Sequence, residues 1–185
     1  MKAHTMNSAI TIEWVTPESW SRDKLPAWQV LNRAGSRTEQ RRFVTRYYPT
    51  GEAGAAIARN SAGEIVGVVT IAVQRGAYNE QYGPFSGRFD PRAFVHEIGV
   101  SPAAKRSGVG TALMRAAAEE IRSRGAQCLA LDVDLTGDVE EATRRAFFTR
   151  CGLVSLRPDR NDDIMGAAVE EVIAATTPEP SPAGG

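Results

Sequence analysis

The segment 100–111, VSPAAKRSGVGT, joins an apolar stretch to an amphipathic one through a turn that contains Gly108 and Gly110. Unpaired backbone N–H groups at a helix start point outward with the positive end of the helix dipole, and glycine has no side chain to keep an anion away. Lys105 and Arg106 add positive charge to the same turn. The segment therefore predicts a phosphate-binding turn between a buried strand and a helix.

The residues on both sides of this turn have the periodicity of a strand and of a helix. Residues 93–100 are mostly apolar and predict a strand, which Pro102 prevents from continuing as a central strand. From Val109 to Ile121 the apolar residues recur at helical spacing, and Gly125 follows where a C-terminal cap belongs. The turn is therefore expected between two buried elements.

A G-x-G sequence alone is weak evidence, because a tight strand-to-helix crossing without a ligand uses the same glycines. The chain has no G-x-x-x-x-G-K-[ST] pattern, and no third glycine follows Gly110 to complete G-x-G-x-x-G. A nucleoside-triphosphate or dinucleotide fold is disfavoured.

The remaining elements alternate in a mixed order. The predicted strands are 8–14, 54–59, 64–73, 93–100, 128–135, 153–156 and 164–169, and the predicted helices are 21–32, 38–47, a helix that begins at 109, and 139–151. Residues 60–63, NSAG, predict the turn of a hairpin. The sequence therefore predicts the order β-α-α-β-β-β-α-β-α-β-β.

The glycine turn resembles the acyl-CoA-binding motif of the GNAT superfamily of N-acetyltransferases, [QR]-x-x-G-x-[GA] after a strand that ends in a valine and a proline. Lys105 occupies the position where the family prefers glutamine or arginine, and Arg106 the position where it often has glycine. Neither change removes the backbone donors or the positive charge. The resemblance implies that the pyrophosphate of coenzyme A is bound by Lys105, Arg106, Ser107, Gly108, Val109, Gly110 and Thr111.

The order of elements is also that of the GNAT fold. The resemblance implies an α+β protein, the GNAT acyl-CoA N-acyltransferase fold, with a mixed central sheet of six to seven strands flanked by about four helices. It covers residues 8–172, which we expect to form one acetyltransferase domain. Residues 1–7 and the proline-containing tail 173–185 are expected to be disordered.

Acetyl transfer from a thioester to an amine needs a deprotonated amine, a polarised carbonyl and a departing thiolate. In the family, backbone N–H groups of the strand before the turn polarise the carbonyl, where a bulge and a splayed neighbouring strand open the sheet. By position the resemblance implies Ile98, Gly99 and Val100 for this role. Gly99 would let the thioester approach closely, although a glycine in a strand equally marks a bulge without a ligand.

The same strand contains two candidates for the base. Several family members have a catalytic histidine or glutamate four or six residues before the final valine, which here gives His96 and Phe94. An imidazole can accept a proton near neutral pH, although a core histidine can also donate to a carbonyl. Glu97 is costly in a buried strand unless it is paired or lines a polar cleft. If the side chains of His96 and Glu97 face opposite sides of the sheet, only one of them lines the cleft. A bulge could change which one does, and we rank His96 first as the base.

The family's usual acid is a tyrosine in a Y-x-x-x-G-[FL] segment, and this chain has Phe148 there. Glu141 replaces the asparagine commonly found seven residues earlier. A thiolate is a tolerable leaving group, so the missing hydroxyl should slow release of coenzyme A without preventing it. The resemblance still places Phe148 beside the cofactor.

Two segments are candidates for the acceptor site. Residues 75–92 form a long loop with several aromatic residues, which either covers the acceptor as a lid or docks on the core. Residues 41–48, RRFVTRYY, are either a helix with a solvated arginine face or a wall of the acceptor cleft. In the second case the acceptor could carry a carboxylate or a phosphate.

Composition excludes several classes of partner. The 185 residues have zero formal net charge, which disfavours nucleic-acid binding, and no apolar run has the length of a membrane span. The N-terminus lacks a signal-peptide core, so we expect a cytoplasmic protein with Cys128 and Cys151 reduced. His4 and His96 are far apart and no C-x-x-C occurs, so no metal is expected. We expect a monomer or homodimer.

Two functions remain open. The first is an N-acetyltransferase that moves an acetyl group from acetyl-CoA to a primary amine of a small molecule or peptide, by direct attack in a ternary complex. The second is a GNAT-fold module that binds acyl-CoA or a metabolite without turnover, for which the missing tyrosine is the best argument.

Overall fold

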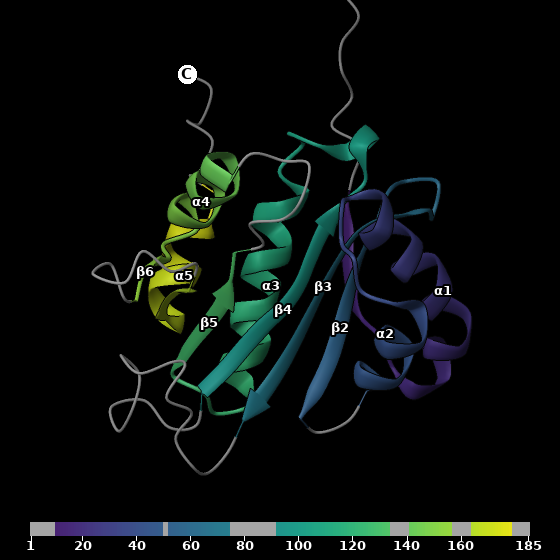
Figure 1. The fold of residues 1–185 in the computed structure, drawn as a ribbon, viewed down its shortest axis with the longest axis horizontal. Coiled ribbons are helices and arrows are strands. Elements are labelled where there is room, and N and C mark those ends of the chain that lie inside the picture. The colour runs from purple at the N-terminus through teal and green to yellow at the C-terminus, as the bar shows by residue number, and fades with distance from the viewer. Residues whose placement is uncertain (1–9, 50–51, 75–91, 134–140, 157–163, 179–185) are drawn as a thin grey trace, which may run out of the picture.

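The computed structural model of the chain describes residues 10–49, 52–74, 92–133, 141–156 and 164–178. In this part of the chain, seven strands form one mixed sheet with helices on both faces (Figure 1). The order across the sheet is β1-β2-β3-β4-β5-β7-β6. The strands are β1 Thr11–Trp14, β2 Ala53–Arg59, β3 Ile65–Gln74, β4 Arg92–Val100, β5 Cys128–Asp132, β6 Val154–Ser155 and β7 Ile164–Ala168. The helices are α1 Pro17–Arg33, α2 Gln40–Arg46, α3 Val109–Ser123, α4 Glu141–Arg150 and α5 Val169–Thr176, with a short 3-10 turn, η2, at Pro102–Ala104.

Only one pair of neighbouring strands in the described part of the sheet is parallel. β4 and β5 run in the same direction, because α3 connects them, and every other described pair is antiparallel. This mixed sheet confirms the fold expected from the sequence. The described residues contain one α-helix more than expected.

The glycine turn leads into α3 as expected. α3 buries Val109, Leu113 and Ile121 against the sheet, and Gly67 of β3 lies beneath its first turns. A Cβ atom at Gly67 would lie 2.8 Å from Val109 Cγ1 and 2.9 Å from Leu113 Cδ1. The absence of a side chain there lets the helix approach the strand closely, which fixes the position of its N-terminus.

α1 and α2 cover the opposite face of the sheet and form a second apolar cluster with β2 and β3, which includes Trp20, Leu31, Phe43 and Tyr47. α1 begins at Pro17, four residues before the predicted start. The reason is a capping box, in which the Thr16 hydroxyl accepts from Ser19 N–H (3.2 Å) and Ser19 Oγ accepts from Thr16 N–H (3.0 Å).

The largest difference from the sequence prediction lies at the C-terminal end. The chain leaves β7 at Ala168 and forms α5, so residues 173–176 are helical where a disordered tail was expected. Val169 and Val172 are buried in the core, and the Glu171 carboxylate accepts from Ala168 N–H at 3.2 Å. Burial of this apolar face against α3 outweighs the polar character of the residues that follow.

Other parts of the expectations lie partly outside the described residues. This holds for the loop 75–91, for the first residues of the strand 8–14, for the end of the strand 128–135, and for the start of the helix 139–151. Both cysteines are buried, and burial raises the pKa of the Cys151 thiol to about 11. No helix among the described residues is long and apolar enough to cross a membrane.

Candidate active site

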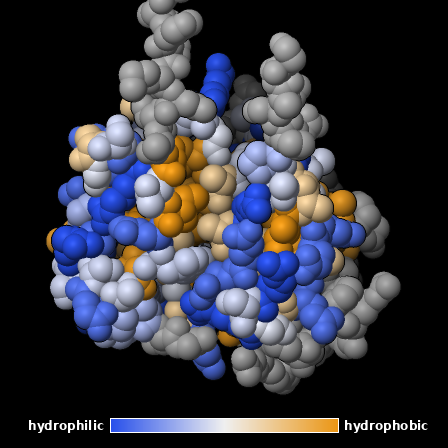
Figure 2. Space-filling view, turned by 180° about the vertical axis from the view of Figure 1, so that it is seen from behind, coloured by the Kyte–Doolittle hydropathy of each residue, from blue (hydrophilic) through white to orange (hydrophobic). Residues whose placement is uncertain are grey.

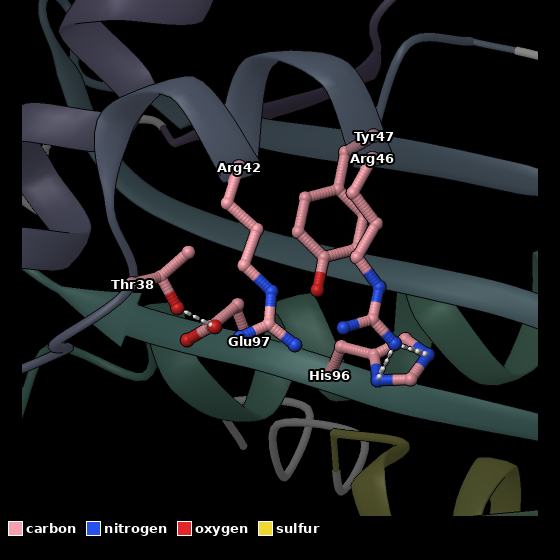
Figure 3. A pocket seen from close by; sticks show the side chains of 6 residues that line it. All are labelled: Thr38, Arg42, Arg46, Tyr47, His96 and Glu97. Carbon is pink, nitrogen blue, oxygen red and sulfur yellow. Dashed lines mark hydrogen bonds between the residues drawn. The ribbon is translucent and has the colours of Figure 1, made fainter.

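A β-bulge in β4 gives the candidate site its shape. β4 pairs with β3 in one register from Val100 to Glu97, where Glu97 is opposite Thr70, but the next pair joins Val95 to Ile71. One residue, His96, is therefore left without a partner on β3. The extra residue changes the alternation of side chains, and His96 and Glu97 both face α2 (Figure 3).

The Glu97 carboxylate is held by hydroxyl groups from the segment that connects α1 to α2. Ser36 Oγ donates to Glu97 Oε2 at 3.0 Å, and the Thr38 hydroxyl donates to Glu97 Oε1. The indole of Trp28 donates to the Thr38 carbonyl at 2.8 Å, which anchors this segment on α1. Glu97 N–H donates to the Thr70 hydroxyl at 3.0 Å, so both ends of the residue are fixed.

His96 has cations and aromatic rings around it. Arg46 Nη2 lies 3.2 Å from His96 Nδ1 and 3.3 Å from Nε2, and the rings of Tyr47 and Phe94 lie 6.0 Å and 6.1 Å from the imidazole, centroid to centroid. Burial and the charges of Arg46 and Arg42 lower the pKa of His96 to about 4. The imidazole is therefore neutral at physiological pH and a weaker base than the ordinary imidazole expected from the sequence, and its unprotonated nitrogen can accept a hydrogen bond from Arg46.

These residues line a cavity of about 120 Å³ between β4 and α2 (Figure 3). The lining residues are Thr38, Arg42, Arg46, Tyr47, His96 and Glu97. Burial raises the pKa of Tyr47, so its hydroxyl stays protonated at neutral pH and can donate a hydrogen bond. The cavity therefore combines a carboxylate, a neutral imidazole, a phenol and guanidinium groups.

The gap beside β4 is the second feature of the site. Within the described residues, β4 pairs with β5 over residues 92–94, opposite 128–130, and from residue 95 onward it pairs with β3 alone. Glu97 N–H points toward β3, as does Ser101 N–H, which donates to the Val66 carbonyl at 2.8 Å. Because N–H direction alternates along a strand, Ile98 and Val100 direct their N–H groups to the side where β5 no longer pairs.

The turn between β4 and α3 has the backbone of an anion-binding loop. Gly108 has φ +83° and is the N-cap of α3, and Arg106 has φ +65°, at the position where the family often has glycine. The first helical hydrogen bond runs from Ala112 N–H to the Gly108 carbonyl at 3.0 Å, so the N–H groups of residues 109–111 have no partner within the helix. Lys105, Arg106 and Ser107 are exposed, and Thr111 is half-buried.

The three glycines of this region have different roles. A Cβ atom at Gly108 would meet nothing within 4 Å, so the space above the turn is open. At Gly110 it would lie 3.2 Å from the Phe147 ring of α4, and at Gly99 it would lie 2.9 Å from the Ala34 Cβ atom. Gly110 and Gly99 thus allow helices to pack closely. The sequence suggested that Gly99 and Gly110 leave room for a ligand. That interpretation fits Gly108 better.

A groove of about 870 Å³ touches the turn from the outer side of α3. It is lined by Gly108 and Thr111 at the turn, by Arg115 further along α3, and by Ile12 and Trp14 of β1. Figure 2 shows apolar side chains gathered on this face of the molecule. The groove and the cavity at Glu97 lie on opposite faces of the sheet.

Phe148, which the resemblance places beside the cofactor, is only 7% exposed and packs in the main apolar core, whose buried residues include Cys151 and Leu153. α4 turns this side chain inward, and Phe147 is the ring that packs on the start of α3. Phe148 is therefore a core residue, and a hydroxyl there would be buried.

Sequence reasoning missed two features of the cavity. Tyr47 and Thr38 are lining residues, and only the general aromatic and basic character of residues 41–48 pointed to this helix. Thr38 could not be found, because its role depends on a contact across 59 residues of sequence. Among the described residues, no group of three or more His, Cys, Asp or Glu side chains could hold a metal ion.

A mixed sheet that splays after its one parallel pair, with a glycine turn leading into the next helix, is the architecture of acyl-CoA N-acyltransferases. The profile of the acetyltransferase (GNAT) family matches residues 13–153, and the chain belongs to that family. None of the curated protein sequences compared with the chain matches it.

Solved structures agree on the fold. A protein described as a GNAT-family acetyltransferase from Desulfovibrio desulfuricans has 16% identity and a TM-score of 0.62, covering 87% of this chain and 99% of that one. An aminoglycoside N-acetyltransferase in complex with CoA has 14% identity and a TM-score of 0.58, with 77% and 89% coverage. A ribosomal-protein-alanine N-acetyltransferase from Brucella melitensis has 18% identity and a TM-score of 0.55, with 77% and 90% coverage.

Proposed function

We propose that the protein transfers an acetyl group from acetyl-CoA to a primary amine of a small molecule or peptide, by direct attack in a ternary complex. The observation that carries this proposal is the position of His96 and Glu97. Both face one cavity on β4, beside the point where β4 separates from β5. A base and a carboxylate therefore lie next to the gap through which a thioester could reach the acceptor.

Acetyl-CoA is proposed to bind at the turn and to pass through this gap. The N–H groups of residues 109–111, with Lys105 and Arg106, would hold the pyrophosphate at the start of α3. The pantetheine arm would then cross between β4 and β5, since the turn and the cavity lie on opposite faces of the sheet. The outward N–H groups of Ile98 and Val100 are placed to polarise the thioester carbonyl.

We assign separate tasks to His96 and Glu97. The Glu97 carboxylate, oriented by two hydroxyl donors, attracts the ammonium of the acceptor. The neutral His96 takes the proton from that ammonium. The amine nitrogen then bonds to the thioester carbonyl carbon, the C–S bond breaks, and the thiolate of coenzyme A takes up a proton. Tyr47 is a donor that remains protonated in the same cavity.

The alternative is a module that binds acyl-CoA or a metabolite without turnover. The phenyl ring of Phe148 favours it, because it lacks the hydroxyl with which the family's tyrosine protonates the departing sulfur. The arrangement of His96 and Glu97 favours the enzyme, because a binding module does not need a neutral imidazole beside a carboxylate.

Release of free thiol from acetyl-CoA, measured with a panel of primary amines, distinguishes the two functions. We expect thiol and N-acetylated product in equal amounts, with the product identified by mass spectrometry. His96→Ala should lose turnover and keep its affinity for coenzyme A, and His4→Ala is the matched control. A protein that binds coenzyme A and releases no thiol with any amine would support the binding module.

A further inference from the structure

Arg42 and Arg46 lie one helical turn apart on α2, and both line the cavity that contains His96 and Glu97 (Figure 3). Like charges at this spacing repel each other. Both arginines are exposed and α2 has no acidic residue in its first turn, so the two guanidinium groups are accessible to a ligand from solvent.

Neither guanidinium has a carboxylate within 4.0 Å among the described residues. Arg59, Arg115, Arg122 and Arg124 each form an ion pair with a glutamate or aspartate, whereas Arg42 and Arg46, like the exposed Arg33 and Arg41, form none within the described part of the chain. Arg46 instead lies over the rings of His96 and Tyr47, with its Cζ atom 5.7 Å from the Tyr47 centroid.

The carboxylate of the cavity is already engaged. The hydroxyl groups of Ser36 and Thr38 donate to the two oxygens of Glu97, and no salt bridge joins Glu97 to Arg42 or Arg46 within the described residues. With His96 neutral, the lining holds two positive charges and one negative charge. Among the described residues, the lining therefore carries one more positive charge than negative charge.

We propose that the acceptor is an amine that also carries a carboxylate or phosphate, with the acid group on Arg42 and Arg46 and the amine at Glu97 and His96. The inference rests on the proposed acetyl transfer and names its substrate class. Guanidinium groups bind carboxylate and phosphate through parallel hydrogen bonds, and the Tyr47 hydroxyl adds a donor at the same end of the cavity.

The size of the cavity agrees with such a substrate. With a volume of about 120 Å³, the cavity is small and suits an acid group on a short carbon chain. The amine and the acid of the acceptor are therefore expected to be separated by few bonds.

Acceptor binding would also change the base. The charges of Arg46 and Arg42 contribute to the low pKa of His96, after burial, while Glu97 on the same strand and the Tyr47 phenol are the other titratable groups in the lining. A bound anion opposes the field of the two arginines, so it raises the pKa of His96 toward its ordinary value of 6.5.

Matched pairs of amines test the substrate class. Glycine, β-alanine and 4-aminobutyrate are compared with their amides, and phosphoethanolamine with ethanolamine, by thiol release from acetyl-CoA. We expect kcat/KM to be at least about 10-fold higher for the acid of a pair. Comparison of kcat/KM between the carboxylate pairs and the phosphate pair shows which acid group is preferred. Equal rates for acids and neutral partners would overturn the inference and leave acetyl transfer intact.

Arginine variants test the residues. Arg42→Gln should raise KM for the preferred acid about 10- to 100-fold, with KM for the neutral partner and for acetyl-CoA unchanged. Arg33→Gln removes the same charge from an exposed position at the end of α1 and should change none of these values. A loss for acid and neutral acceptors alike would overturn the assignment of Arg42.

A binding measurement separates the inference from the proposed function. The imidazole signal of His96, assigned with His96→Asn, is followed by NMR as inorganic phosphate or propionate is added to the protein without acetyl-CoA. We expect its apparent pKa to rise with either anion in the parent and less in Arg42→Gln. If this occurs without thiol release from any amine, acetyl transfer fails and the anion site stands; if neither anion affects His96, the anion site fails.

Discussion

His96 and Glu97 are adjacent in the chain and yet face the same side of the sheet, because the bulge in β4 gives His96 no partner on β3. In a regular strand, adjacent side chains point to opposite faces. The bulge therefore brings an imidazole and a carboxylate into one cavity, at the point where β4 has separated from β5. Both residues therefore face the cleft, and they differ in the role that we propose for each.

The two residues should affect different kinetic constants. His96→Ala is expected to lower kcat about 10²- to 10⁴-fold, the usual contribution of a positioned base, while KM for acetyl-CoA barely changes. Glu97→Gln keeps the shape of the side chain and removes its charge, so it should act mainly on KM for the acceptor. Steady-state kinetics with both substrates varied check this. Full activity in His96→Ala together with a dead Glu97→Gln would transfer the role of base to Glu97.

The pH dependence of stability should report the environment of His96. Its pKa is about 4 in the folded protein and 6.5 when unperturbed, so between these values the unfolded chain binds a proton that the folded chain does not. Stability is therefore fully present above pH 6.5 and falls as the pH drops toward 4, by at most about 3 kcal/mol.

Denaturant unfolding at a series of pH values measures this loss. His96→Asn should flatten the curve over that interval, and His4→Asn should keep the slope of the parent. A parent whose stability does not change between pH 6.5 and pH 4.5 would show that the imidazole is not held neutral by its surroundings.

Periodicity is enough to place most elements, because alternation and helical spacing are local properties of the sequence. It placed β2, β3, β4 and α3 within a residue or two. The bulge depends on register with β3, which is not local. The only sign of the bulge in the sequence is that two polar residues, His96 and Glu97, are adjacent inside an apolar strand. An extra residue in that strand lets both side chains face one cleft.

Other features of the site depend on tertiary contacts that the sequence does not show. Phe148 was placed beside the cofactor by a family motif, but the rotation of α4 buries it and puts Phe147 against Gly110. The helical spacing of Val169, Val172 and Thr176 was a signal for α5, hidden by the polar tail that follows. In both cases the packing of one helix on another decided the outcome.

Phe148→Tyr is expected to destabilise the protein without raising turnover. The side chain is 7% exposed in an apolar cluster, so the added hydroxyl lacks a partner and costs roughly 1 to 3 kcal/mol. For a chain of this length, each kcal/mol lowers Tm by about 2 to 4 °C. Thermal unfolding and thiol release are measured on the same samples. Unchanged Tm with faster turnover would place the hydroxyl at the cofactor and show that α4 is rotated.

The last prediction concerns the turn at the start of α3. Gly108 has φ +83° and open space above it, so Gly108→Asp and Gly108→Asn impose a similar backbone strain but differ in charge. If the N–H groups of residues 109–111 hold the pyrophosphate, the aspartate variant should raise Kd for coenzyme A at least about 10-fold more than the asparagine variant.

Gly63 gives the matched control, because it has φ +79° and equally open space in the hairpin turn between β2 and β3. Gly63→Asp should lose a similar amount of stability and keep the affinity of the parent. Calorimetry with coenzyme A measures each Kd. Since strain is shared by all three variants and charge at the turn belongs to Gly108→Asp alone, equal affinities in the three would place the pyrophosphate elsewhere.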